Sequence, residues 1–316
     1  MEDYPETLLD FEERFATEQA CRQYLAQMRW PEGFRCPRCG QGKAWRTKRG
    51  LYRCSACDHQ VSVTAGTIFQ DTRKPLRVWF RALWAVTSQK HGASALGVQR
   101  VLGLKRYETV WTWLHKARTA MVRPGRDRLS GTVEVDETYI EGPKSGKAGR
   151  GSAGKALVVI AVEDKGEEMG RIRLRRVVDA SAESLTAAVT EGVTPGSTVR
   201  TDGWQGYMSL AGSGYLHQVA RASGGVGEDL LPLAHRVASL LKRWLVGTHQ
   251  GAVRASHLDH YLDEFTFRFN RRTSQYRGKL FYRLLQQAVQ TDPAPYSALA
   301  KGIRSGPERR PRRRRT

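Results

Sequence analysis

Two aspartates stand where an acidic side chain is unexpected, and their chemistry is that of a metal site. Asp136 lies within "GTVEVDETYIEG", a run of β-branched residues that predicts a strand. A carboxylate in such a strand is costly unless it is paired or binds a metal. Asp202 ends a second predicted strand, in "STVRTDGWQGY". On neighbouring strands the two carboxylates could hold divalent ions suited to phosphoryl transfer; alternatively, each only caps a turn.

Four cysteines form the most specific pattern in the chain. Cys36 and Cys39 make one CxxC turn, and Cys54 and Cys57 make another, on either side of a predicted hairpin that turns near Gly50. This is the arrangement of a zinc ribbon, in which four thiolates hold Zn²⁺ tetrahedrally and leave no open position. We therefore predict a structural zinc ion rather than two disulfides, which would suit a secreted protein.

A predicted helix in "LAHRVASLLKRWLVGTH" presents a polar line opposite an apolar side. Spacings of i, i+4 and i+7 align His235, Ser239 and Lys242 on one face. Arg236 and Arg243 flank this line. The opposite side is apolar and predicts burial against a core: Val237, Leu240, Leu241 and Trp244.

The order of the predicted elements indicates an α/β fold with a ribonuclease H-like mixed sheet flanked by helices. Further strands are predicted at "ALVVIAVEDKG", "RIRLRRVVDA" and "YLHQVA", and a helix at "SAESLTAAVTEGV". Upstream, helices near 94–102 and 107–121 have the layout of a DNA-binding helix-turn-helix or of a plain helical bundle. We expect five regions: an N-terminal helical segment (1–30), a zinc ribbon (31–70), a helical helix-turn-helix region (71–125), a ribonuclease H-like domain (126–292) and a basic disordered tail (293–316).

The charge of the chain favours a polyanionic partner. Lys and Arg number 52 against 31 Asp and Glu, a formal net charge of +21. Nucleic acid is the commonest such partner, although charge can also serve solubility alone. The predicted DNA-contacting residues lie in a Gly-rich basic stretch and on the helix described above: Lys144, Lys147, Arg150, Lys155, Arg236 and Arg243. Without a long apolar run or a secretory signal, the chain is expected to be cytoplasmic and not bound to a membrane.

Several stretches together resemble bacterial insertion-sequence transposases (ISXO-like) that join a zinc ribbon to a ribonuclease H-like DDE-type domain. They are "FRCPRCG", "YRCSACDHQVSVTAGTIF", "PLRVWFRALW", "VEVDETYIEG", "TDGWQGY", "HRVASLLKRWLVGTHQGAV" and "HLDHYLDEFTFRFNRR". The resemblance implies that Asp136 and Asp202 are the first two catalytic carboxylates. In many relatives a Glu precedes the helix lysine by seven residues, and that position here is His235, seven before Lys242.

The histidine at position 235, where many relatives have a glutamate, changes the set of ligands expected at the site. We expect His235 to complete a site for Mg²⁺ or Mn²⁺ as an imidazole ligand, or to orient the attacking water. Lys242, two turns along the same face, is expected to contact a DNA phosphate near the scissile bond. Because a nitrogen ligand suits Mn²⁺ better, we expect Mn²⁺ to support activity better. The rival third acids are Glu228, Asp229 and, more remotely, Asp263 and Glu264, which are expected on the solvent side of their helix.

The function implied by the resemblance is that of a DNA transposase. It would bind terminal inverted repeats, cleave a DNA strand with the help of metal ions and transfer it to target DNA, as a homodimer or larger assembly. The alternative is an inactive, domesticated DNA-binding regulator, which the non-acidic third position motivates.

Overall fold

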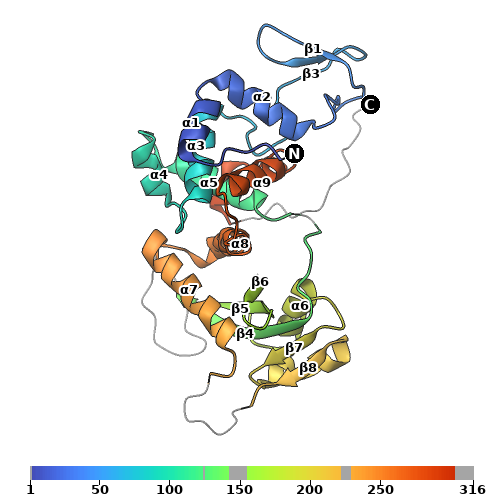
Figure 1. The fold of residues 1–316 in the computed structure, drawn as a ribbon, viewed down its shortest axis with the longest axis vertical. Helices are drawn as coiled ribbons and strands as arrows, with labels where there is room; N and C mark the ends of the chain where they lie inside the picture. The colour runs from blue at the N-terminus through green and yellow to red at the C-terminus, as the bar shows by residue number, and fades with distance from the viewer. Residues whose placement is uncertain (1, 124, 142–154, 222–228, 303–316) are drawn as a thin grey trace. The chain divides into compact units, whose positions relative to one another are not determined.

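The computed structural model describes residues 2–123, 125–141, 155–221 and 229–302. The chain divides into two compact units, unit 1 with residues 1–124 and 274–316 and unit 2 with residues 125–273 (Figure 1). Among the described residues, no helix combines the length and the apolar character needed to cross a membrane.

Unit 1 is built around aromatic rings from helices far apart in the sequence. Phe281 packs against Phe11 and Phe80, with ring centroids 5.3 and 5.5 Å apart, and Phe80 also contacts Phe15. The helices around this core are α1 (Leu8–Arg14), α2 (Glu18–Arg29), α3 (Leu76–Ser88) and α9 (Gly278–Ala288). Because Phe281 brings α9 into unit 1, the boundary between the units, at 273/274, differs from the end predicted for the ribonuclease H-like domain, at residue 292.

The predicted zinc-ribbon hairpin is present in unit 1. Strands β1 (Ala44–Arg46), β2 (Tyr52–Cys54) and β3 (Gln60–Val61) form an antiparallel sheet in that order. The turn between β1 and β2 passes through Gly50, whose φ of 75° is a conformation that glycine adopts without steric cost. The hairpin therefore separates the two CxxC turns, as the sequence predicts.

The two helices of the predicted helix-turn-helix are α4 (Ala95–Val101) and α5 (Tyr107–Ala120). Most of α5 is buried or half-buried, and its exposed positions are Tyr107 and Glu108 in the first turn. The N-terminal residues of a recognition helix are the ones that reach base edges. Only the first turn of α5 is therefore accessible enough for that role.

The segment after α9 contains one more helix. Helix α10 (Tyr296–Ala300) buries Leu299, which is 1% exposed, so the predicted disorder from residue 293 is wrong for this part. Leu299 and Ala294, which is 3% exposed, supply the buried apolar side chains of this short segment. Residues 303–316, the arginine-rich end of the predicted tail, lie outside the described residues.

Unit 2 has the predicted mixed sheet with helices on both faces (Figure 1). The strand order is β6-β5-β4-β7-β8, antiparallel across β6-β5-β4 and parallel across β4-β7-β8. The strands are β4 (Thr132–Glu141), β5 (Lys155–Asp164), β6 (Met169–Val177), β7 (Thr198–Thr201) and β8 (Leu216–Val219). The α/β, ribonuclease H-like fold class is thus confirmed.

The two faces of the sheet have separate apolar cores. Helix α6 (Ala182–Gly192) and the 3₁₀ helix η1 (Gln205–Ser213) cover one face, where Val133 and Val135 of β4 point. Helices α7 (Pro232–His249) and α8 (Leu258–Phe269), joined through η2 (Ala255–His257), cover the other. Because side chains alternate along a strand, Glu134 and Asp136 point toward α7.

Helix α8 is buried on more than one side. Four of its apolar residues are buried, namely Leu258, Tyr261, Leu262 and Phe265, and Phe269 is half-buried. Asp263 and Glu264, expected on the solvent side, are 8% and 0% exposed, so that expectation is wrong. Thr266 and Phe267 are buried as well, which shows that this helix has no fully solvated face at its centre.

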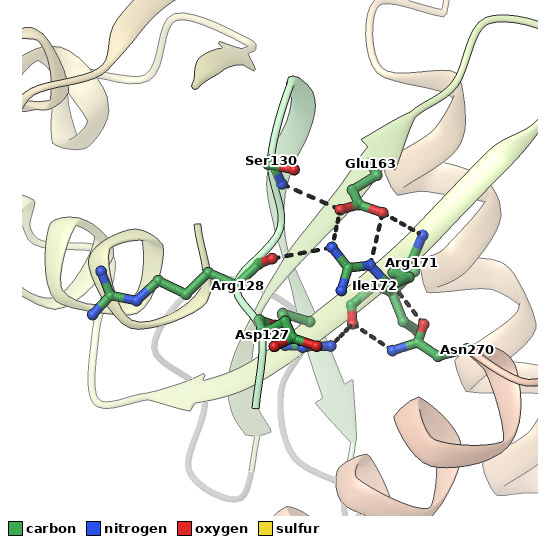
Figure 2. A network of polar contacts seen from close by, with 8 residues as sticks. Asp127, Arg128, Ser130, Glu163, Arg171, Ile172 and Asn270 are labelled. Carbon is green, nitrogen blue, oxygen red and sulfur yellow. Dashed lines mark hydrogen bonds and ion pairs between the residues drawn. The ribbon is translucent and has the colours of Figure 1, made fainter. Parts of the chain in front are cut away.

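A buried carboxylate stabilises the hairpin between β5 and β6 (Figure 2). Glu163, 1% exposed, accepts hydrogen bonds from the guanidinium of Arg171 at 2.6 and 3.0 Å and from the backbone N–H of Arg171 and Ser130. Burial raises the pKa of Glu163, but these hydrogen bonds outweigh it, and the pKa lies below its usual value. Nearby, the Asn270 side chain bonds both backbone groups of Ile172 and so ties the end of α8 to β6.

Candidate active site

Asp136 occupies the centre of the site, midway along β4. Its side chain is 16% exposed and lies on the face of the sheet that α7 covers. Burial raises the pKa of Asp136 to about 6; the charges of Glu137 and Asp202 also raise it, while a backbone hydrogen bond and His235 act in the opposite direction. Burial and neighbouring negative charges both destabilise the ionised form of Asp136. A bound cation or a proton would offset this cost.

Asp202 follows the end of β7, the parallel neighbour of β4. In the parallel register of β4 and β7, Glu134 lies opposite Arg200. Two residues further along both chains, Asp136 therefore lies beside Asp202. The chain turns away at Gly203, with φ of 84°, where a Cβ atom would lie 2.7 Å from Val219 Cγ1. Glycine is therefore required there, and the turn leaves Asp202 exposed at the carboxyl end of the strand.

His235 reaches the same place from the first turn of α7. Its Nε2 lies 3.3 Å from Asp136 Oδ2, and its Nδ1 lies 2.5 Å from Asp229 Oδ1. The apolar side predicted for this helix is buried, with Val237 and Leu241 inaccessible to solvent. The buried side fixes the rotation of α7 and so directs His235 at the sheet.

Glu134 is a residue of the site that the sequence analysis missed. Its Oε2 accepts the backbone N–H groups of Leu233 and Ala234, at 2.9 and 3.1 Å, in the first turn of α7. It is 1% exposed, and Arg200 approaches its other oxygen at 3.7 Å. Burial raises the pKa of Glu134, against the hydrogen bonds and the charge of Arg200, which lower it. Its spacing of two from Asp136 was the available signal, since both must share one face of the strand.

Glu137 and Tyr207 form a second pair that the sequence analysis did not single out. The Tyr207 hydroxyl donates a hydrogen bond to Glu137 Oε2 at 2.8 Å, and Tyr207 is fully buried. Burial and the nearby carboxylates raise the pKa of Tyr207. Tyr207 therefore remains a hydrogen-bond donor that fixes Glu137 at the edge of the site.

A pocket of about 480 Å³ connects the site to the polar line of α7. It is lined by residues of β4 and α7: Asp136, Glu137, Thr138, His235, Ala238, Ser239 and Lys242. The alignment of His235, Ser239 and Lys242 predicted from their spacing is thus confirmed. Lys242 is exposed at the far end of this line from His235, two helical turns away.

The other basic residues predicted to contact DNA fall into three groups. Arg236 and Arg243 are exposed on α7. Lys155 is only 16% exposed, and its Nζ lies 2.9 Å from Glu141; this contact and the charge of Lys242 lower the pKa of Glu141. The remaining three lie outside the described residues: Lys144, Lys147 and Arg150.

The rival third acids differ in their position relative to Asp136. Glu228 lies outside the described residues. Asp229 contacts His235 on the side of the ring away from Asp136. Glu264 lies on α8, within 3.8 Å of Arg268, and does not line the pocket.

The donor set at Asp136 fits a small divalent cation. Asp136 Oδ2 and His235 Nε2 are 3.3 Å apart, near the separation of about 3 Å between adjacent ligands in an octahedral site. In the described part of the chain, only the four cysteine sulfurs form a group of three or more ligand atoms that all lie within 4.8 Å of one another. The carboxylate of Asp202 is therefore farther than this from at least one atom of the Asp136–His235 pair. Asp202 is exposed, and its Oδ1 accepts the backbone N–H of Trp204 at 2.9 Å, so its side chain would have to leave this hydrogen bond to join the pair.

The cysteine cluster of unit 1 is a well-formed metal site. The sulfur atoms of Cys36 and Cys57 are 3.7 Å apart, and those of Cys39 and Cys54 are 3.5 Å apart. A tetrahedron of thiolates around Zn²⁺, with Zn–S bonds of about 2.3 Å, has edges of about 3.8 Å. The four sulfurs therefore match a structural zinc site.

Comparisons with known proteins find matches over the two regions that contain these residues. Residues 128–270 match the ISXO2-like transposase domain, and residues 16–60 match the transposase zinc-ribbon domain. The chain is also 27% identical over 281 residues to an uncharacterized protein in transposable element ISH50 of Halobacterium salinarum, a match that covers 80% of this chain and 91% of the relative. The two domain matches together span more than half of the chain.

Proposed function

Because the chain belongs to the ISXO2-like transposases of insertion sequences, with their zinc ribbon at its N-terminal side, we propose that it cuts and joins DNA at the ends of such an element. Asp136, Asp202 and His235 would hold divalent cations, Mg²⁺ or Mn²⁺. When bound, these ions supply a polarised water or 3′-hydroxyl nucleophile and offset the charge that develops on the phosphate.

The residues of the chain have separate roles in this proposal. Asp136 provides a carboxylate on a rigid strand, so its position does not depend on a loop. Asp202 turns in from the end of the neighbouring strand. His235 supplies the third ligand from α7, and Lys242, two turns along the same helix, contacts the phosphate next to the scissile bond.

DNA contacts outside the reacting phosphate would come from both units. Arg236 and Arg243 extend the basic surface of α7, and Lys144, Lys147 and Arg150 add further charge close to Glu141 in the sequence. The zinc ribbon and the first turn of α5 would recognise the terminal inverted repeats. Two ends must be held together with target DNA, so we propose a homodimer or larger assembly.

The observation that carries the proposal is the convergence at Asp136. The side chain is shielded from solvent, its pKa is raised to about 6, and His235 Nε2 approaches it at 3.3 Å from another element. A purely structural acid in a strand is expected to have a Lys or Arg partner, as Glu163 does with Arg171, whereas the ion-pair contact of Asp136 in the described part of the chain is with His235. The buried carboxylate of Asp136, with other carboxylates and an imidazole nitrogen beside it, is instead typical of a ligand for a metal ion.

A strand-cleavage assay tests the proposal. The substrate is a labelled duplex that carries the end of the element, read from the DNA flanking the gene. We expect the wild type to release a 3′-hydroxyl end only with Mg²⁺ or Mn²⁺, and Asp136→Asn and Asp202→Asn to cleave at least about 100-fold more slowly with unchanged binding. Asp179→Asn, at the start of α6, serves as the control.

The outcome also separates the two candidate functions. Binding of the duplex without cleavage by the wild type, with either ion, would favour the inactive DNA-binding regulator. Cleavage that persists in Asp136→Asn would contradict the proposed site while leaving the family assignment intact.

A further inference from the structure

Asp229 contacts His235 at the start of α7, on the side of the ring that faces away from Asp136. Asp229 Oδ1 lies 2.5 Å from His235 Nδ1 and also accepts the backbone N–H of Leu231 at 3.2 Å. The Leu231 contact fixes the carboxylate against the first turn of the helix. The imidazole is thereby held between two carboxylates, one on each ring nitrogen.

The two contacts of the imidazole differ in distance. A carboxylate oxygen accepts hydrogen bonds, so the short contact at Nδ1 requires a proton on that nitrogen. With the proton on Nδ1, a neutral ring carries its lone pair on Nε2, the atom 3.3 Å from Asp136 Oδ2. Two electron-pair donors at that separation suit a shared cation better than a direct bond.

We propose that Asp229 is a positioning residue: it holds His235 in the tautomer and orientation that make Nε2 a metal ligand. This inference rests on the proposed function, since it assumes that His235 is a ligand. It assigns Asp229 a different role from the third acid considered above. A carboxylate that accepts the second N–H of a ligating histidine typically changes metal affinity by about 10–100-fold when it is removed.

The geometry of α7 makes the role specific to Asp229. Glu134 also contacts the first turn, but it accepts the backbone N–H groups of Leu233 and Ala234. In the described part of the chain, the His235 ring contacts Asp136 through Nε2 and Asp229 through Nδ1. Glu134 therefore anchors the helix, whereas Asp229 acts on the ring.

The test combines two readouts on the full, zinc-loaded chain. The first is the ¹⁵N chemical shifts of the His235 ring in protein labelled at histidine, assigned by comparison with His235→Ala. Without added Mg²⁺ or Mn²⁺, we expect His235 of the wild type to carry its proton on Nδ1, and Asp229→Ala to lose that preference. The second is Mn²⁺ affinity measured by calorimetry, which we expect to fall about 10–100-fold in Asp229→Ala.

Two further variants make the result decisive. Asp229→Asn keeps an oxygen that can accept from Nδ1 and from Leu231, so we expect its tautomer to match the wild type and its affinity to stay within about threefold. If Asp229 were itself a ligand, the Asn variant would bind Mn²⁺ as weakly as the Ala variant. Asp179→Ala is the matched control, because Asp179 also accepts the N–H of the residue two positions on, Ser181, at the start of a helix outside the pocket.

Failure of the inference is distinguishable from failure of the proposed function. An unchanged tautomer and Mn²⁺ affinity in Asp229→Ala would overturn the positioning role alone. Unchanged Mn²⁺ affinity in His235→Ala would overturn the assignment of His235 as a ligand, and with it the inference, whatever the tautomer.

Discussion

The cap that Glu134 provides to α7 allows a quantitative prediction. Glu134→Ala removes the acceptor for the N–H groups of Leu233 and Ala234. A buried donor left without a partner costs about 1–3 kcal/mol. Ala234 is fully buried and Leu233 only half-buried, so water can replace the acceptor at one of the two positions. We therefore expect α7 to lose about 2–4 kcal/mol of stability against local opening.

The conservative variant separates the acceptor from the charge. Burial raises the pKa of Glu134, so ionisation of this side chain costs free energy in the folded protein. Glu134→Gln keeps an oxygen within reach of both N–H groups and removes the charge. We expect it to change the stability of α7 by less than about 1 kcal/mol.

Hydrogen exchange read by mass spectrometry on peptides from α7 is the suitable assay, since it reports local opening in a chain of two units. A loss of 2–4 kcal/mol corresponds to exchange roughly 30- to 700-fold faster in Glu134→Ala. Glu167→Ala, in the exposed turn between β5 and β6, is the control and should leave α7 unchanged. Wild-type exchange in Glu134→Ala would refute the capping role, and equal acceleration in Glu134→Gln would show that the charge, not the acceptor, stabilises the helix.

Three further predictions concern stability and zinc. The pKa of Glu163 in the folded protein is below its usual value of 4.5, so the charged side chain stabilises the fold above that pH and this contribution is lost as the pH falls through the folded pKa. In denaturant titrations at several pH values, Glu163→Gln should therefore show a weaker loss of stability on the acid side than the wild type. An unchanged pH dependence would contradict this. Gly170→Ala places a Cβ 2.6 Å from Glu163 Cβ, and urea denaturation should show a loss of about 1–3 kcal/mol; a neutral effect would mean that the hairpin adjusts freely. Cys39→Ser should reduce bound zinc from one ion per chain toward none in metal analysis, whereas full retention would disprove a four-thiolate site.

The local elements of unit 2 could be predicted because their patterns are strong. The β-branched run around Asp136 predicted β4, and the charge inside it was a clear anomaly. The apolar spacing from Val237 to Trp244 predicted the buried side of α7, and the line of His235, Ser239 and Lys242 followed from it. Periodicity alone was enough for these features, since each depends on residues within one element.

Features that depend on distant packing could not be predicted in this way. Glu134 caps a helix that begins almost 100 residues later in the sequence. The residues around Glu134 contain no pattern from which that contact could be predicted. Helix α9 belongs to unit 1 because Phe281 packs against Phe11, a residue near the other end of the sequence. Asp263 and Glu264 were misplaced because a helix with one apolar stripe was assumed to expose its other side.

Cleavage by the wild type and by His235→Ala, each with Mg²⁺ and with Mn²⁺, shows whether His235 belongs to the catalytic metal site. The substrate is the labelled duplex with the end of the element, and binding is measured in parallel. We expect faster cleavage with Mn²⁺ in the wild type and a loss of at least about 100-fold in the variant with either ion, at equal DNA binding. Equal cleavage by the two proteins would show that His235 is not a metal ligand and that another residue completes the site with Asp136 and Asp202.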